Sequence, residues 1–174
     1  MPTTLYDGTI RNIICSLKSL RNCLQIAQAK HSDPQSLVTA RLISDMQPLS
    51  YQIYVATRTS DRLAAVMLNK DSLPNHENDL KSFDDFLQRI DQVLSNLEQV
   101  RPEEINALDG VPSVANMSRN ERENHVPTSA SNAFGAAMPH LHFHCDMAYA
   151  ILRKEGVPLG KADYIQAFAD GWDM

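Results

Sequence analysis

Glycine is scarce in this sequence, with six among 174 residues, whereas Leu, Ala, Gln and Glu are abundant. This balance favours helices. No run of 18 apolar residues occurs, so we expect no membrane span. The N-terminus, MPTTLYDGTIRN, has no basic segment leading into an apolar one. The sequence therefore predicts no secretory signal.

Positive charge and cysteine are also in short supply. Sixteen Lys and Arg residues against 21 Asp and Glu give a net charge of −5. This charge argues against nucleic acid as a partner, because phosphate binding needs a basic surface. The three cysteines, Cys15, Cys23 and Cys145, are an odd number without metal-type spacing. We expect reduced thiols in a cytoplasmic protein.

Apolar residues, by contrast, are plentiful enough for a globular protein. Hydrophobic residues make up 43% and charged residues 21% of the chain, values typical of a folded protein rather than a disordered one. A chain of 174 residues is long enough to bury a core. We therefore expect a single domain over residues 1–174.

Four segments repeat apolar residues at three- and four-residue steps, the pattern of amphipathic helices. Each is bounded by residues that start or stop helices, such as Pro34 after the first and Gly156 after the last. Pro139 lies inside the last segment and predicts a kink. Together they predict an all-α four-helix bundle. The segments are residues 5–30, 48–68, 79–100 and 128–155.

The connections differ in character. Residues 35–47 are expected to be partly helical, residues 69–78 are a polar loop, and residues 103–108 suit one extra helical turn. Residues 110–127 are polar and contain two prolines, which predicts a long, variable loop before the last helix, suited to a lid or a partner surface. Residues 157–174 are expected to pack back on the bundle through Leu159, Tyr164, Ile165 and Phe168.

Three of the six histidines, His140, His142 and His144, fall within five residues. His140 and His144 are four apart and share one face of a helix. Core-facing apolar residues lie beside His144, so we expect it to point inward and His142 to lie on the opposite, solvated face. Two interpretations of His144 remain: a proton-transfer or metal-binding residue, or a hydrogen-bonded core histidine.

The second helix offers partners for His144. Asp45, Gln52 and Thr59 are spaced by seven and share a face if helix covers all three. Polar groups on an inward face form either a structural network or a site. A carboxylate beside an imidazole holds its tautomer and raises its pKa. Asp45 has an equally good interpretation as an N-cap near Pro48.

Three segments resemble a known family: LYDGTI (5–10), ARLISDMQPLSYQ (40–52) and PHLHFHCDMAYAILRKEGVPLGKADYI (139–165). They are similar to a domain family of unknown function in the DinB/YfiT-like superfamily of metalloenzymes. The resemblance covers nearly the whole chain apart from residues 110–127. It implies a four-helix bundle, often a homodimer, with a cavity between the helices.

The metal-binding members of that superfamily hold a divalent ion with one His from the second helix and an H-x-x-x-H pair on the last. Some of those members are thiol-dependent transferases. The pair matches His140 and His144, but the second-helix position carries Thr59, a poor ligand for zinc or nickel. Asp45, His76 or His125 would then have to supply the third ligand.

Three functions follow. The first is a small-molecule enzyme of secondary metabolism that needs no metal, an isomerase, cyclase, dehydratase or other lyase acting on an enolisable, polyketide-like or aromatic substrate. The second is a zinc- or nickel-dependent transferase or hydrolase using His140 and His144. The third is a non-catalytic bundle that binds a ligand or dimerises. In the first, His144, Asp45 and Gln52 are catalytic, and Thr59, Tyr51, Tyr149 and His140 bind substrate.

Overall fold

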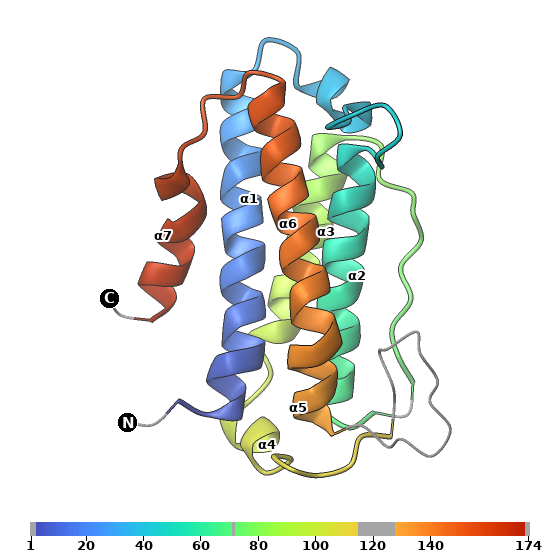
Figure 1. The fold of residues 1–174 in the computed structure, drawn as a ribbon, viewed down its shortest axis with the longest axis vertical. Helices are drawn as coiled ribbons and strands as arrows, with labels where there is room; N and C mark the ends of the chain where they lie inside the picture. The colour runs from blue at the N-terminus through green and yellow to red at the C-terminus, as the bar shows by residue number, and fades with distance from the viewer. Residues whose placement is uncertain (1–2, 71, 115–127, 173–174) are drawn as a thin grey trace.

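The computed structural model describes residues 3–70, 72–114 and 128–172. Four long helices form a bundle: α1 (Asn12–Lys30), α2 (Leu49–Met67), α3 (Phe83–Leu97) and α6 (Met138–Lys154) (Figure 1). This arrangement confirms the predicted all-α bundle. Within the described ranges, the one β-type pairing is an isolated bridge between Pro112 and Thr128.

The helix directions follow from contacts along the bundle. Gln28 near the end of α1 bonds Asp84 at the start of α3, and Lys18 pairs with Glu98 beyond the end of α3. Hence α1 and α3 are antiparallel, and Figure 1 shows α6 running with α1 and α2 running with α3. Because α2 and α3 are parallel, residues 68–70 and 72–82 run back along the bundle. The sequence had indicated only a polar loop there.

A capping arrangement sets the start of α3 later than the predicted residue 79. The Ser82 hydroxyl accepts a hydrogen bond from the Asp85 N–H at 3.1 Å, and the Asp85 carboxylate accepts one from the Lys81 N–H at 2.9 Å. The first bond satisfies an amide group that a helix leaves unpaired at its first turn, and the second holds the residue before the N-cap. The face predicted for this helix is confirmed, since Phe83, Phe86, Ile90, Val93 and Leu97 are buried.

The last helix of the bundle is interrupted where proline predicted a kink. It comprises α5 (Ser129–Asn132), a π-helical segment η3 (Ala133–Ala137) and α6. Pro139 has no N–H to donate, and its ring crowds the carbonyl of residue 135 in a regular α-helix. The wider π turn avoids this conflict. As predicted, Thr128 caps the start through its hydroxyl, and Gly156 follows the end with φ +88°.

Shorter elements fill the remaining chain. A π-helical segment η1 (Asp7–Arg11) leads into α1, a 3₁₀ helix η2 (Pro34–Thr39) lies in the link before α2, and α4 (Pro102–Asn106) follows α3. The predictions of a partly helical link and an extra turn are confirmed. The predicted loop over residues 110–127 lies mainly in residues 115–127, which are outside the described ranges together with His125.

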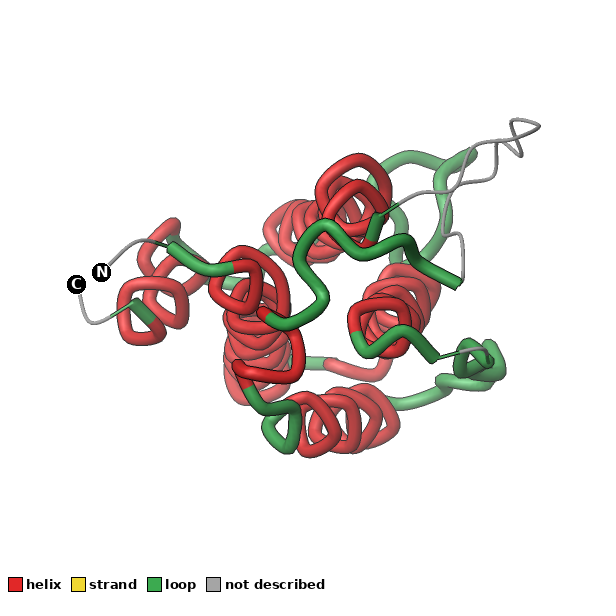
Figure 2. Tube along the Cα trace, turned by 90° about the horizontal axis from the view of Figure 1, so that it is seen from below, coloured by secondary structure: helices red, strands yellow, loops and turns green. Residues whose placement is uncertain are grey.

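The C-terminal tail forms a further helix, α7 (Lys161–Gly171), which lies outside the bundle against α1 (Figures 1 and 2). Arg11 donates a hydrogen bond to the Gly171 carbonyl at one end, and Asn22 donates one to the Asp163 carbonyl at the other. The tail thus packs back as predicted. Ile165 was wrongly placed in that contact, because it is 39% exposed.

The three cysteines are buried free thiols. Burial raises the pKa of Cys23 to about 12 and also raises the pKa of Cys15 and Cys145. All three are therefore protonated and unreactive near neutral pH. Across the described residues, no helix is both long enough and apolar enough to cross a membrane.

Gly171 lies close against α1, because a Cβ at this position would collide with Sγ of Cys15. We predict that Gly171→Ala lowers the free energy of unfolding by about 1–3 kcal/mol through overpacking, measured by urea denaturation. Gly135→Ala is the control, since a Cβ there meets nothing within 4 Å. Adding Cys15→Ala should recover part of the loss; a further loss in the double variant would contradict the collision.

Candidate functional site

His144 lies in the interface between α6 and α2 and is 8% exposed. Helical periodicity places it beside Leu141, Cys145 and Ala148, all buried in the core. Its Nδ1 lies 2.7 Å from Oε1 of Gln52 on α2. The inward orientation predicted for His144 and its pairing with Gln52 are therefore present in the structure.

The backbone before α2 determines which proton His144 carries. Nε2 of Gln52 donates a hydrogen bond to the Gln47 carbonyl at 3.0 Å. The reversed amide would set two acceptor oxygens against each other, so Oε1 must face His144. Nδ1 of His144 is then the donor to Oε1, and Nε2 carries the lone pair. The imidazole is held as one defined neutral tautomer.

Burial and a neighbouring imidazole keep His144 uncharged. Desolvation, with a smaller contribution from His140, lowers the pKa of His144 from 6.5 to about 4. Gln52 cannot offset this, because a neutral amide stabilises the imidazolium far less than a carboxylate does. Near neutral pH, Nε2 of His144 is a hydrogen-bond acceptor and proton acceptor.

Aromatic rings surround the His144 side chain. The His140 ring lies 4.8 Å away between centroids at an interplanar angle of 31°. Tyr51 of α2 and Phe143 approach edge-on, at 6.2 Å and 5.3 Å. Phe143 is 53% exposed and His140 is also exposed. The site is therefore an aromatic cluster that begins at the surface and ends at the buried His144–Gln52 pair.

Two predicted site residues do not reach this cluster. Asp45 is exposed in the turn before α2, outside the helix, and makes no hydrogen bond or ion pair within the described residues. It does not cap α2 either, since the N-cap is Pro48. Tyr149 packs instead against Tyr164 of α7, with ring centroids 5.8 Å apart. Tyr149 lies five residues after His144, about 140° around the helix, which explains this placement.

The positions of Thr59 and His142 can also be compared with the predictions from the sequence. Thr59 is 6% exposed and lies two turns beyond Gln52 on the same face of α2, as predicted. His142 was expected in solvent, and this was wrong. It is half-buried, and its Nε2 lies 3.1 Å from Oδ1 of Asn12 on α1. The α1 helix is parallel to α6 and covers the face that His142 occupies.

The described residues do not complete a metal site of the superfamily type. His140 and His144 provide two imidazoles on one helix. No group of three or more His, Cys, Asp or Glu side chains within residues 3–70, 72–114 and 128–172 is placed to hold a metal ion. His76 is engaged elsewhere, 2.7 Å from Asp61. A resident ion normally needs at least three protein ligands, and His140 and His144 supply two.

The fold and site together define a class: an all-α bundle with a buried histidine between its second and last helices. The chain belongs to the family described as a domain of unknown function (DUF1993), which matches residues 5–165. It is also similar to the crystal structure of a DinB family member protein from Shewanella denitrificans, with 30% identity and a TM-score of 0.79. That match covers 92% of this chain and 91% of the other. None of the curated proteins matches.

The tautomer and pKa of His144 can be tested without a substrate. We predict that Gln52→Glu raises the pKa of His144 by about one unit or more, because a carboxylate at Nδ1 stabilises the imidazolium. The measurement is an NMR titration of the histidine Cε1–H signals, assigned with His144→Asn. Gln47→Ala serves as the control, since the backbone carbonyl that orients Gln52 remains. An unchanged titration in Gln52→Glu would refute the contact.

Proposed function

We propose that this protein is a small-molecule enzyme of the isomerase or lyase type, in which His144 removes a proton from an enolisable substrate. The observation that carries this proposal is the hydrogen-bond series from the Gln47 carbonyl through Gln52 to Nδ1 of His144. It leaves the Nε2 lone pair of His144 as the group that can accept a proton.

The low pKa of His144 narrows the substrate class. A base whose conjugate acid has a pKa of about 4 is fully unprotonated at neutral pH, but it is a weak base. It removes protons efficiently only from carbon acids that are already activated. A carbon between two carbonyl groups has this property, because the resulting anion is delocalised over both oxygens. This chemistry supports a 1,3-dicarbonyl substrate of the polyketide type.

The surrounding residues suit such a substrate. The rings of Tyr51, His140 and Phe143 provide flat apolar surfaces beside His144. The Tyr51 hydroxyl is a donor of the kind that stabilises an enolate oxygen, and the Thr59 hydroxyl lies on the same α2 face as Gln52. We assign Tyr51, Thr59 and His140 to substrate binding and Gln52 to positioning His144.

We predict that the wild-type protein accelerates exchange of the acidic C–H of cyclic 1,3-diketones with D2O, followed by ¹H NMR. His144→Asn should reduce the rate by about 10²–10⁴-fold, because its amide can still donate to Gln52 but has no Nε2. Activity should fall as the pH drops through about 4, where Nε2 becomes protonated.

His142→Asn is the matched control, since the His142 ring is held by Asn12 on the α1 side. It should retain the exchange activity, provided that both variants unfold at similar temperatures. Wild-type exchange no faster than that of His144→Asn across a panel of diketones would instead favour a non-catalytic bundle.

Metal dependence is tested separately. We predict that protein purified without a histidine tag retains its exchange activity after dialysis against a chelator, and that elemental analysis finds no stoichiometric zinc or nickel. A stoichiometric ion whose removal abolishes activity would instead establish the metal-dependent alternative with His140 and His144. Restoration by one added metal would identify that ion.

A further inference from the structure

Two half-buried arginines of α2, Arg58 and Arg62, lie on the same stripe of the helix as Tyr51. Arg58 follows Tyr51 by seven residues and Arg62 follows it by eleven, which places both within about 20° of Tyr51 around the helix axis. The Tyr51 ring contacts His144, with 6.2 Å between the ring centroids. The arginine pair therefore continues the side of α2 that borders the aromatic cluster around His144.

The arginine pair is within reach of a molecule bound at His144. Arg58 is six residues after Gln52, or about 9 Å along the axis, and its side chain leans back toward the start of the helix. Because α6 runs antiparallel to α2, His140 lies between His144 and the arginines along this interface (Figure 1). A ligand that extends from His144 to the arginine pair therefore spans about 5–10 Å.

Neither arginine has an anionic partner within the part of the chain that the structure describes. There, Arg58 makes one hydrogen bond, from Nε to Oδ1 of Asn75 at 3.2 Å, and Arg62 makes none. Asp61, the only acidic residue of α2, is already held by His76, with 2.7 Å between Oδ2 and Nε2. A guanidinium carries five N–H donors, so both side chains keep donors for a ligand.

The two guanidinium groups also act on each other. Burial, followed by the positive charge of Arg58, lowers the pKa of Arg62. Arg62 nevertheless stays charged near neutral pH, because a guanidinium keeps its proton in proteins. An anion placed between the two groups would offset their repulsion and would accept charge-assisted hydrogen bonds from both.

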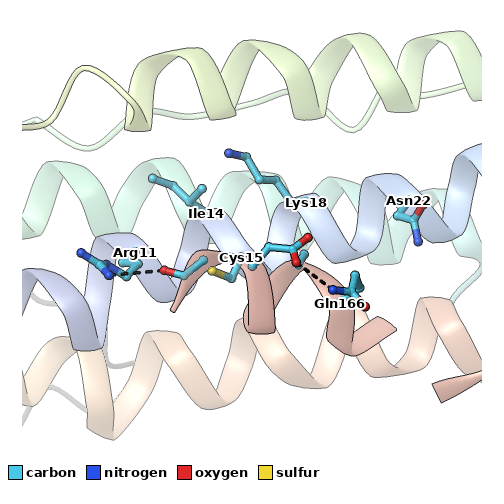
Figure 3. A pocket seen from close by; sticks show the side chains of 9 residues that line it. Arg11, Ile14, Cys15, Lys18, Asn22 and Gln166 are labelled. Carbon is cyan, nitrogen blue, oxygen red and sulfur yellow. Dashed lines mark hydrogen bonds between the residues drawn. The ribbon is translucent and has the colours of Figure 1, made fainter. Parts of the chain in front are cut away.

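The groove between α1 and α7 shows the contrasting case (Figure 3). Arg11 pairs with Asp7 at 3.0 Å and donates a hydrogen bond to the Gly171 carbonyl, and Lys18 pairs with Glu98 at 3.0 Å. The protein itself neutralises these cations, so this groove gives no reason to expect a bound anion. The arginine pair on α2 has no such carboxylate among the described residues.

We propose that the arginine pair binds a carboxylate of the substrate, so that the substrate is an enolisable 1,3-dicarbonyl acid. The carbon between the two carbonyl groups lies at Nε2 of His144, while the carboxylate accepts N–H groups from Arg58 and Arg62. A polyketide-type chain ends in a carboxyl group, which suits this class. The identity of the reacting carbon rests on the proposed function, whereas the anion site does not.

Binding is tested first, without any reaction, by NMR titration of the ¹⁵N-labelled full-length protein with 4-phenylbutyrate. The ring of this probe suits the aromatic cluster, and its carboxylate is far enough from the ring to reach the arginine pair. We expect saturable shifts around His144 and the arginine pair, with a Kd of about 1 mM or tighter. The uncharged 4-phenylbutyramide should bind at least tenfold more weakly. Equal binding of the acid and the amide would overturn the proposal.

Variants at the arginine pair and beside it locate the anion. Arg58→Gln combined with Arg62→Gln removes both charges and should weaken the binding of 4-phenylbutyrate at least tenfold. Asn75→Ala is the matched control, since it removes the bond to Nε of Arg58 but keeps both charges. Arg21→Gln removes one charge from α1, where Arg21 pairs with Asp91. Both controls should bind as the wild type does, and undiminished binding by the double variant would contradict the anion site.

The exchange assay separates this assignment from the proposed chemistry. We expect kcat/KM for 5,7-dioxooctanoate to exceed that for its methyl ester at least tenfold, and to fall to the value for the ester in the double variant. Equal rates for acid and ester in the wild type would overturn the anion assignment and leave the role of His144 standing. Saturable binding of 4-phenylbutyrate at the arginine pair without exchange of the acid would support the anion site and refute the proposed base.

Discussion

The hydrogen bond between His144 and Gln52 crosses the interface in which α2 and α6 pack together. Both residues are nearly fully buried, so breaking the bond leaves two polar groups without water or a partner, at about 1–3 kcal/mol each. The bond therefore favours the observed register of the two helices and fixes the tautomer of the imidazole. It also depends on the link before α2, because the Gln47 carbonyl orients the Gln52 amide. The orientation of the Gln52 amide, and through it of His144, is thus held by a segment without regular secondary structure.

Much of the fold could be predicted because periodicity reports which face of a helix is buried. The α3 stripe of Phe86, Ile90 and Val93 is the clearest case. The ends of helices were harder to predict than their buried faces. The polar pattern of the sequence continues before Ser82, whereas the capping bonds of Ser82 and Asp85 mark the start of α3. The π turn at η3 was not predictable, because Pro139 indicates a conflict in the helix but not how the backbone resolves it. The α7 helix lies outside the core and has no buried residue. A periodic pattern of buried positions therefore did not mark it as a helix in the sequence.

The site was predictable to the extent that helical spacing governs it. Spacing and the neighbouring apolar residues predicted that His144 and Gln52 lie on the inward faces of their helices. The prediction that Asp45 joins the site was wrong, because its spacing from Gln52 places the two on one face only within a helix. The α2 helix starts after Pro48, so Asp45 lies outside it. The role of Gln47 could not have been read from the sequence, because it acts through a backbone carbonyl. The Asp61–His76 pair joins a helix to a loop fifteen residues later, and no periodicity connects such positions.

The amide at position 52 and the low pKa of His144 are two consequences of one constraint. A carboxylate at this position would favour the imidazolium, and an ion pair between α2 and α6 would then need further donors to offset its desolvation. The described structure supplies one polar partner to each end of the Gln52 amide and no more. A neutral amide beside a neutral imidazole pairs Nδ1 of His144 and both ends of the Gln52 amide without placing a charge in the interface. The same neutrality makes His144 a weak base, and for this reason we propose an already acidic carbon as its substrate.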